Sequence, residues 1–255
     1  MSDELNKAPR MVVARRALLI GAAGTVMASP LLAAGEGGEG GEGAATEGLD
    51  PRVAMLTSIG FFDASLRIVA DLYALGEIGE AQDQLAGSHH AHYDDIAGGL
   101  ASFGADGFEE EAMAFAEAID SGADALVVAD RFAVVHQALL AAYAGADASE
   151  TVHAAEALVR AAYGDYEAGV YEGDVISPHE YRDAWGFAKV AEERLQALAG
   201  AEDAEVAQAG ARGVAAMADV WALFPSLNAT TVDAVDASVL AGAAARIEIA
   251  GLRLD

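Results

Sequence analysis

The chain has 255 residues, and its 41 acidic against 14 basic residues give a formal net charge of −27 at pH 7. This charge excludes nucleic acid as a partner and disfavours an anionic membrane surface, because a polyanion would meet phosphates with repulsion, whereas it concentrates cations. The sequence contains no cysteine, which excludes disulfides, iron–sulfur clusters, c-type haem attachment and a lipid anchor on a thiol.

Residues 1–34 have the form of a bacterial export signal. Arg15 and Arg16 close a basic segment, an apolar run begins at Ala17, and small residues follow over 28–34. The adjacent arginines and the weakly hydrophobic run favour the twin-arginine route, with secretion by another route as the alternative. We therefore expect the protein in the periplasm.

The signal could be cleaved after Ala28, or further along after Ala33 or Ala34. An uncleaved anchor is disfavoured, because glycines and a proline interrupt a run that is marginal against the roughly 20 apolar residues of a spanning helix. Removal of residues 1–34, which carry four basic and two acidic residues, would leave a net charge of −29 and no integral membrane domain.

Residues 35–49 are rich in glycine and glutamate and predict a flexible linker. From 50 to 255 the pattern is helical, with apolar residues at a 3.6-residue spacing and glycine or proline between segments. The expected helices cover 51–75, 77–85, 88–103, 107–120, 123–143, 148–166, 177–198, 203–223 and 231–252. Strand signals are nearly absent, so the predicted fold class is all-α, an antiparallel bundle of about eight helices.

Three local signals refine this picture. Asp50 is expected to cap the first helix, with Pro51 at its first position. Ser177 and Glu180 have the spacing of a capping box. Asp63 falls within the apolar face of the first helix, among the leucines and valines expected to pack there.

Histidines supply the strongest candidate metal ligands. His89 and His92 stand three apart, on one face of an expected helix that also carries acidic residues, and imidazole with carboxylate suits iron, copper, zinc or nickel. The alternative is a helix start with capping residues and exposed histidines. His136 lies in an apolar run, where a histidine bonded to a core neighbour is the ordinary interpretation.

Glu150 and His153 form a Glu-x-x-His motif of the kind that di-iron bundles carry twice. Here the motif occurs once, which argues against a ferritin-type oxidase. The predicted metal ligands are therefore His89, His92, His136, Glu150 and His153, gathered by folding. No nucleophile elbow, phosphate-binding loop or dinucleotide fingerprint is present, so the sequence indicates neither a nucleotide nor catalytic residues.

One segment, residues 163–188, resembles exported helical segments associated with iron-permease-type transporters and with periplasmic cytochromes. The matching positions are Tyr166, Gly169, Val170, Gly173, Val175, Ile176, Glu180, Tyr181 and Phe187. The resemblance implies a link to iron transport.

Two functions follow from these observations. The first is an exported, non-enzymatic helical protein that binds or delivers a transition metal ion, iron or copper, beside a membrane transporter or a redox partner. The alternative is a metal-free interaction or structural protein of the periplasm whose acidic face binds a basic protein.

The export hypothesis is tested by fusing residues 1–48 to a reporter that is active only outside the cytoplasm. Replacing Arg15 and Arg16 by lysine should abolish reporter activity if the twin-arginine machinery reads the pair. Unchanged activity of the Lys-Lys fusion would exclude that route and leave secretion by another.

Overall fold

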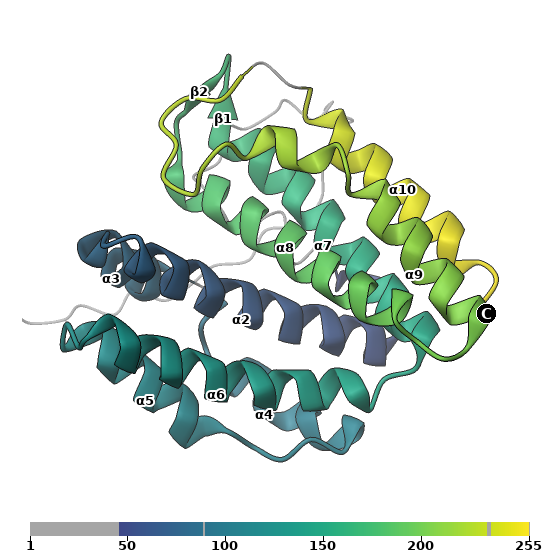
Figure 1. Ribbon diagram of the computed structural model, residues 1–255, viewed down its shortest axis with the longest axis horizontal. Helices are drawn as coiled ribbons and strands as arrows, with labels where there is room; N and C mark the ends of the chain where they lie inside the picture. Colours follow the sequence, from purple (N-terminus) through teal and green to yellow (C-terminus); the bar gives the residue numbers. More distant parts are fainter. Residues whose placement is uncertain (1–45, 89, 234–235, 255) are drawn as a thin grey trace, which may run out of the picture. The chain divides into compact units, whose positions relative to one another are not determined.

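The computed structural model describes residues 46–88, 90–233 and 236–254 (Figure 1). Two compact units divide the chain, 1–36 and 37–255, and the description concerns the second. The predicted export signal and the first eleven residues of the predicted linker, 35–45, lie outside the described residues.

The described part of the second unit is almost entirely helical, so the predicted all-α class is confirmed, with nine α-helices where about eight were expected. The elements are α2 (Pro51–Ala74), α3 (Ile78–Gly87), α4 (Asp94–Leu100), η1 (Ala101–Phe103), α5 (Glu109–Asp120), α6 (Ala125–Ala144), α7 (Ala148–Gly169), β1 (Val170–Tyr171), β2 (Asp174–Val175), α8 (Pro178–Ala199), α9 (Ala204–Ala216), η2 (Val220–Leu223) and α10 (Ser238–Gly251).

Helix α2 lies in the middle of this unit, with α4, α5 and α6 on one side and α7 to α10 on the other (Figure 1). Two hydrophobic cores meet on it. Leu56, Ile59 and Phe62 belong to the core formed with α3 to α6, whereas Phe61 and Ala64 belong to the core formed with α7 to α10. Because α2 is apolar around most of its circumference, it can serve both cores.

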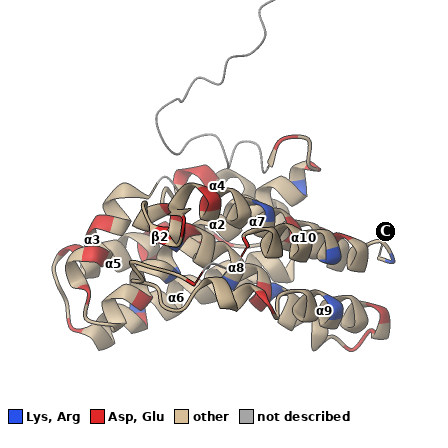
Figure 2. Ribbon diagram, turned by 90° about the horizontal axis from the view of Figure 1, so that it is seen from above, with Lys and Arg blue, Asp and Glu red and all other residues tan. Residues whose placement is uncertain are grey.

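Aspartates begin several helices. Asp50 accepts a hydrogen bond from the backbone N–H of Arg52, with Pro51 at the first helical position, as predicted. Asp124, Asp147 and Asp203 cap α6, α7 and α9 in the same way. Part of the chain's large negative charge, which is spread over the helices in Figure 2, therefore satisfies helix starts.

The helix expected over 88–103 begins only at Asp94, because tertiary contacts hold the preceding residues as a loop. The Ser88 hydroxyl donates to the Ser65 hydroxyl at 3.0 Å, and the ring of His90 packs against Phe61 at 5.0 Å between centroids. The Tyr93 hydroxyl accepts a hydrogen bond from the N–H of Phe108 at 2.9 Å. These contacts to other elements replace the backbone bonds of a helix.

A two-residue turn, which the sequence did not indicate, joins β1 and β2. Its residues, Glu172 and Gly173, both have positive φ, 52° and 90°, as the favoured hairpin turn requires. The backbone N–H of Val175 donates to Thr230, and that of Val232 donates to Gly173. These bonds hold residues 230–232 extended beside the hairpin, which is why α10 begins at residue 238 and not at 231.

The helix expected over 203–223 is also shorter than predicted. Helix α9 ends at Ala216, and the short η2 follows from Val220. Among the described helices, α2 and α6 are long and apolar enough to cross a membrane by length and composition. The apolar stretch of α2 is 78% buried inside the protein, whereas that of α6 is only 22% buried.

Capping differs from the prediction at two helix starts. The Ser177 side chain makes no capping hydrogen bond, and the N–H of Ser177 donates to Gly169, which fixes the backbone at the hairpin exit. A complete capping box occurs instead at Asp147 and Glu150, whose side chains and backbone N–H groups bond reciprocally at 2.7 and 3.0 Å.

We therefore expect Asp147→Ala to lower the free energy of unfolding by about 1 kcal/mol, because an orphan N–H of α7 loses its partner. Ser177→Ala is the matched control and should change it by much less. Urea denaturation followed by circular dichroism measures both. Equal losses in the two variants would contradict the assignment of the cap.

Candidate functional site

The structure describes one member of the predicted histidine pair. His89 lies outside the described residues, and His92 is exposed in the loop before α4. His90, which the sequence did not single out, has its ring 5.0 Å from that of Phe61 and 5.6 Å from that of Phe187. In this loop a histidine therefore packs between α2 and α8.

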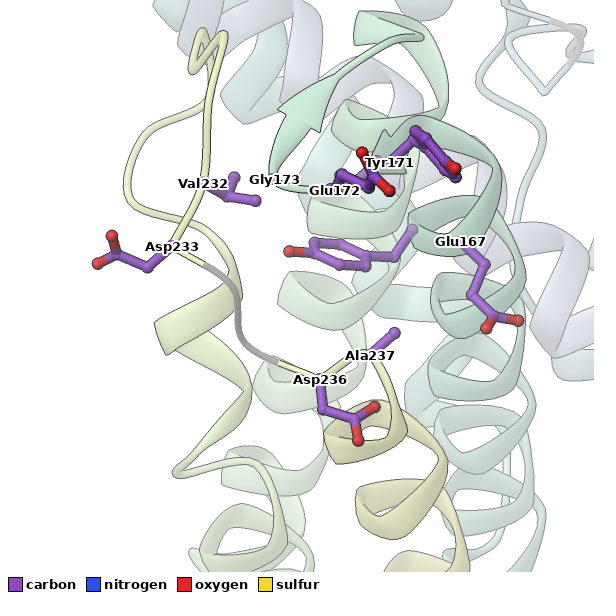
Figure 3. A pocket seen from close by; sticks show the side chains of 10 residues that line it. Glu167, Tyr171, Glu172, Gly173, Val232, Asp233, Asp236 and Ala237 are labelled. Atoms are coloured by element: carbon purple, nitrogen blue, oxygen red, sulfur yellow. The ribbon is translucent and has the colours of Figure 1, made fainter.

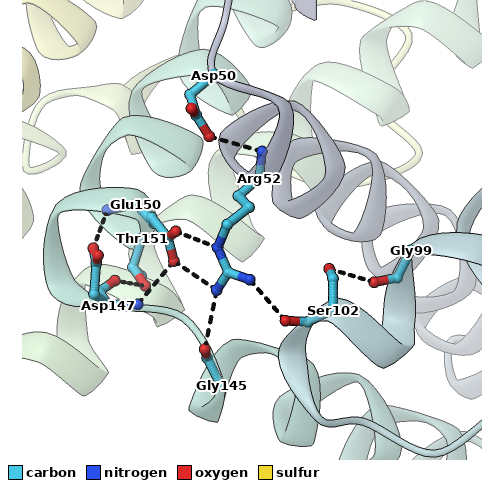
Figure 4. Close-up of polar contacts among 8 residues, drawn as sticks. All are labelled: Asp50, Arg52, Gly99, Ser102, Gly145, Asp147, Glu150 and Thr151. Atoms are coloured by element: carbon cyan, nitrogen blue, oxygen red, sulfur yellow. Dashed lines mark hydrogen bonds and ion pairs between the residues drawn. The ribbon is translucent and has the colours of Figure 1, made fainter.

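Glu150, the acid of the Glu-x-x-His motif, is engaged by other groups (Figure 4). Its carboxylate pairs with the Arg52 guanidinium and accepts the N–H of Asp147. The arginine lowers the pKa of Glu150, more than its partial burial raises it. Both carboxylate oxygens therefore bind Arg52, and Oε2 also caps the start of α7.

Arg52 joins four segments through this contact (Figure 4). Besides Glu150, its guanidinium donates to the carbonyls of Ser102 at 2.7 Å and Gly145 at 3.2 Å. It also lies 4.2 Å from the ring centroid of Phe103. The start of α2 is thereby tied to η1, to the end of α6 and to the start of α7.

His153 follows Glu150 on α7 and is partly buried beside Gly251 of α10. His136 lies on α6, where its Nδ1 donates to the Asp63 carboxylate at 3.0 Å and its ring stacks on Phe132. Glu150 and His153 thus share α7, whereas His92, in the loop before α4, and His136, on α6, lie on other segments. Within the described part of the chain, no three His, Asp or Glu side chains gather in a group that could hold a metal ion.

The partner of His136 is a buried ionic cluster. Asp63 of α2 is fully buried, and its second carboxylate oxygen pairs with Arg194 of α8, which is 3% exposed. Burial alone would raise the pKa of Asp63, but the His136 hydrogen bond and the positive charge of Arg194 hold it below its usual range. The carboxylate is therefore ionised in the core.

Tyr143 of α6 completes the cluster. Its hydroxyl donates to the carbonyl of Leu56 at 2.7 Å, and the Arg194 guanidinium lies 4.3 Å from its ring centroid. Burial raises the pKa of Tyr143 to about 12. These contacts fasten α2, α6 and α8 together.

Sequence reasoning did not identify this cluster, although one signal was present. Asp63 falls at a position of α2 that the helical spacing assigns to the core, and a carboxylate there requires a buried counter-ion. The partner could not be chosen from the sequence. Arg194 is 131 residues away, and no pattern distinguishes it from Arg160 on α7 or Arg182 on α8.

The structure also contains an open cleft at the hairpin end of α7 (Figure 3). Its volume is about 580 Å³, and it is lined by Tyr166, Glu167, Val170, Tyr171, Glu172, Gly173, Val232, Asp233, Asp236 and Ala237. Four carboxylates therefore border the cleft, and no basic residue is among the lining residues. Figure 3 shows these carboxylates around the rim, drawn from α7, the hairpin turn and the segment before α10.

Tyr166 lines the same cleft and is 3% exposed. Its ring packs edge-on against Phe224, 5.5 Å away, and burial raises its pKa. Its hydroxyl oxygen is buried without a hydrogen-bond partner in the described part of the chain. A buried hydroxyl without a partner is uncommon in proteins, and at a cleft it offers an oxygen ligand or a donor to whatever enters.

Two of the acidic lining groups have local partners that hold them in place. Glu167 accepts a hydrogen bond from Tyr163, one turn earlier on α7, which raises the pKa of that tyrosine. Asp236 accepts the backbone N–H of Ser238 at 2.9 Å, which lowers its pKa. The Asp236 carboxylate is therefore ionised well below neutral pH.

The buried cluster generates a stability prediction. Asp63→Asn should lower the free energy of unfolding by about 3–5 kcal/mol, because Arg194 then stays buried without its counter-ion. The double variant Asp63→Leu/Arg194→Met should recover most of this loss, since both charges leave together. Chemical denaturation of the three proteins measures the effect.

The same cluster sets a pH dependence. The lowered pKa of Asp63 means that its stabilisation is present above the unfolded-state pKa of about 4 and is lost as the pH falls through the folded-state value. The double variant should lack this component of acid unfolding. If it unfolds in acid as the parent does, the pair does not carry that dependence.

Comparison with known proteins gives one family-model match, in the second half of the chain. No curated protein and no solved structure matches. Residues 144–250 span α7 to α10, four helices with the hairpin among them, and contain every residue of the cleft. This segment matches the family model of the iron permease-associated 4-helix bundle domain, which confirms the predicted link to iron-permease-type transporters.

Proposed function

We propose that this protein is an exported, non-enzymatic helical protein of the periplasm that binds iron at the cleft between α7, the hairpin and the start of α10, and delivers it to a membrane transporter. The observation that carries the proposal is the position of the cleft within the segment that matches an iron permease-associated domain. Export rests on the pattern of residues 1–34.

The chemistry of the lining residues supports iron over copper. The cleft offers carboxylate and phenol oxygens, and neither histidine nor methionine lines it. Hard cations such as ferric iron bind oxygen ligands, whereas copper prefers imidazole and thioether groups. The negative charge of the rim raises the local concentration of cations.

The geometry also suits a protein that hands its metal on. The four rim carboxylates come from three segments and do not form a closed group in the described structure. An ion held there by few protein ligands keeps water or a carrier ligand in its other positions. Such a site exchanges its ion readily, as delivery to a transporter requires.

The metal-free alternative has one observation in its favour. Helix α6 lies outside the matched segment and leaves an apolar face uncovered in the described structure. A protein whose role is interaction would need such a surface. A direct measurement of metal binding therefore distinguishes the iron-binding function from the metal-free alternative.

Terbium(III), a hard trivalent ion that tyrosine excites to luminescence, is a suitable probe because Tyr166 and Tyr171 line the cleft. We expect saturable terbium luminescence that Fe(III)-citrate displaces. The variant Glu167→Gln/Glu172→Gln/Asp233→Asn/Asp236→Asn should lose it. The control Asp83→Asn/Asp106→Asn/Glu110→Gln/Glu202→Gln removes the same charge from exposed positions elsewhere and should keep it.

The pH dependence distinguishes this site from the predicted histidine ligands. Binding through imidazole falls as the pH drops through about 6.5, whereas binding through carboxylates persists to about pH 4. Replacing His92, His136 and His153 by alanine should leave the terbium signal unchanged. A signal that follows the histidines, or that the charge-matched control also loses, would contradict the cleft.

A further inference from the structure

Helix α6 presents an uncovered face. Leu126, Val127 and Val134 are 77%, 44% and 50% exposed, although the helix is apolar enough to be a core element. In Figure 1, α6 lies in the layer on one side of α2, and its inner face packs there through Val128, Val135 and Leu139. Exposed apolar surface of this extent on a long helix marks an interaction site.

Four exposed residues of α6 share one stripe. Val127, Asp130, Arg131 and Val134 stand at positions i, i+3, i+4 and i+7, which lie on the same side of a helix. Asp130 and Arg131 make no ion pair or hydrogen bond with any described residue. Their charges are thus available to a partner.

The order of these four residues is self-complementary. In an antiparallel pair of α6 helices related by a two-fold axis midway between residues 130 and 131, Val127 faces Val134 of the other copy. In the same arrangement Asp130 faces Arg131 of the other copy, and each contact occurs twice. A parallel pair would place each charge opposite its own kind. Two-fold contacts of this type are the commonest in homo-oligomers.

We propose that the protein self-associates through this α6 stripe, packed antiparallel against the α6 stripe of a second copy. Charge favours a second copy over other occupants. The stripe is neutral in a chain of net charge −27, so it is a place where two copies approach without local repulsion. A lipid bilayer would have to bury the charges of both Asp130 and Arg131 without counter-ions from the bilayer core.

The association should be weak. A helix of 20 residues is about 30 Å long, so one helix pair covers less surface than the interfaces of stable dimers. Such a contact is formed at high protein concentration and is set in register by its two ion pairs.

Sedimentation velocity of the full chain tests the proposal over a concentration series. Asp130→Arg places like charges opposite each other at both contacts and should weaken the dimer by more than about tenfold. Of the two single variants, Asp130→Arg is the more informative. It lowers the net negative charge of the chain, so general charge repulsion alone would predict tighter association, whereas the stripe predicts weaker association. Arg131→Asp should be monomeric as well.

An equimolar mixture of these two variants restores both ion pairs and has the same total charge as the parent dimer. The mixture should therefore associate like the parent, as should the double variant Asp130→Arg/Arg131→Asp. A parent that stays monomeric throughout overturns the proposal. An Asp130→Arg variant that associates as tightly as the parent overturns it too.

Cross-linking provides a readout of register, since the chain has no cysteine of its own. Oxidation of Val127→Cys mixed with Val134→Cys should give a disulfide-linked heterodimer. Each variant alone should give little, because residue 127 of one copy lies about 10 Å along the helix from residue 127 of the other. Cross-linking of either variant alone, in equal yield, would contradict the antiparallel register.

Discussion

A single ionised carboxylate in the core organises this protein. Asp63 is fully buried on α2, and a buried charge is tolerated only where partners surround it. Those partners are His136 from α6 and Arg194 from α8, which lie on opposite sides of α2. The charge therefore specifies how the helices before residue 144 dock on the four that follow. Apolar contacts stabilise both sides, but they are less selective about register than an ion pair of fixed geometry.

The cleft and the contacts of Arg52 with neighbouring segments follow from this arrangement. When α2 is docked between α6 and α8, Arg52 pairs with Glu150 and fixes the start of α7. The other end of α7 leads into the hairpin. The turn at Glu172 and Gly173 and the extended segment at Val232 then place carboxylates around one opening. The oxygen ligands proposed for iron are thus set by backbone hydrogen bonds between segments about 60 residues apart.

The sequence predicts the helices well but did not identify the cleft, for reasons visible at particular residues. Capping by Asp50 and the apolar spacing are local properties, so they can be read directly. The loop residues 88 and 90–93 and the extended residues 230–232 are determined by contacts with distant elements, which no local pattern records. Glu150 shows the same limit, because its motif spacing does not indicate that its carboxylate completes a helix cap and pairs with Arg52. The resemblance over 163–188 lies within the segment that matches the family model, and those residues build the hairpin end of α7 and the start of α8.

The position of Arg194 also separates two meanings of a domain. The matched segment begins at residue 144, but the carboxylate that neutralises Arg194 and much of the apolar cover of α7 and α8 come from α2. A fragment that begins at residue 144 would expose an unpaired guanidinium within an apolar surface and would tend to aggregate or to bind chaperones. The matched segment is therefore smaller than the compact unit that contains it, and the region before the match supplies part of its core and the counter-ion of its buried arginine.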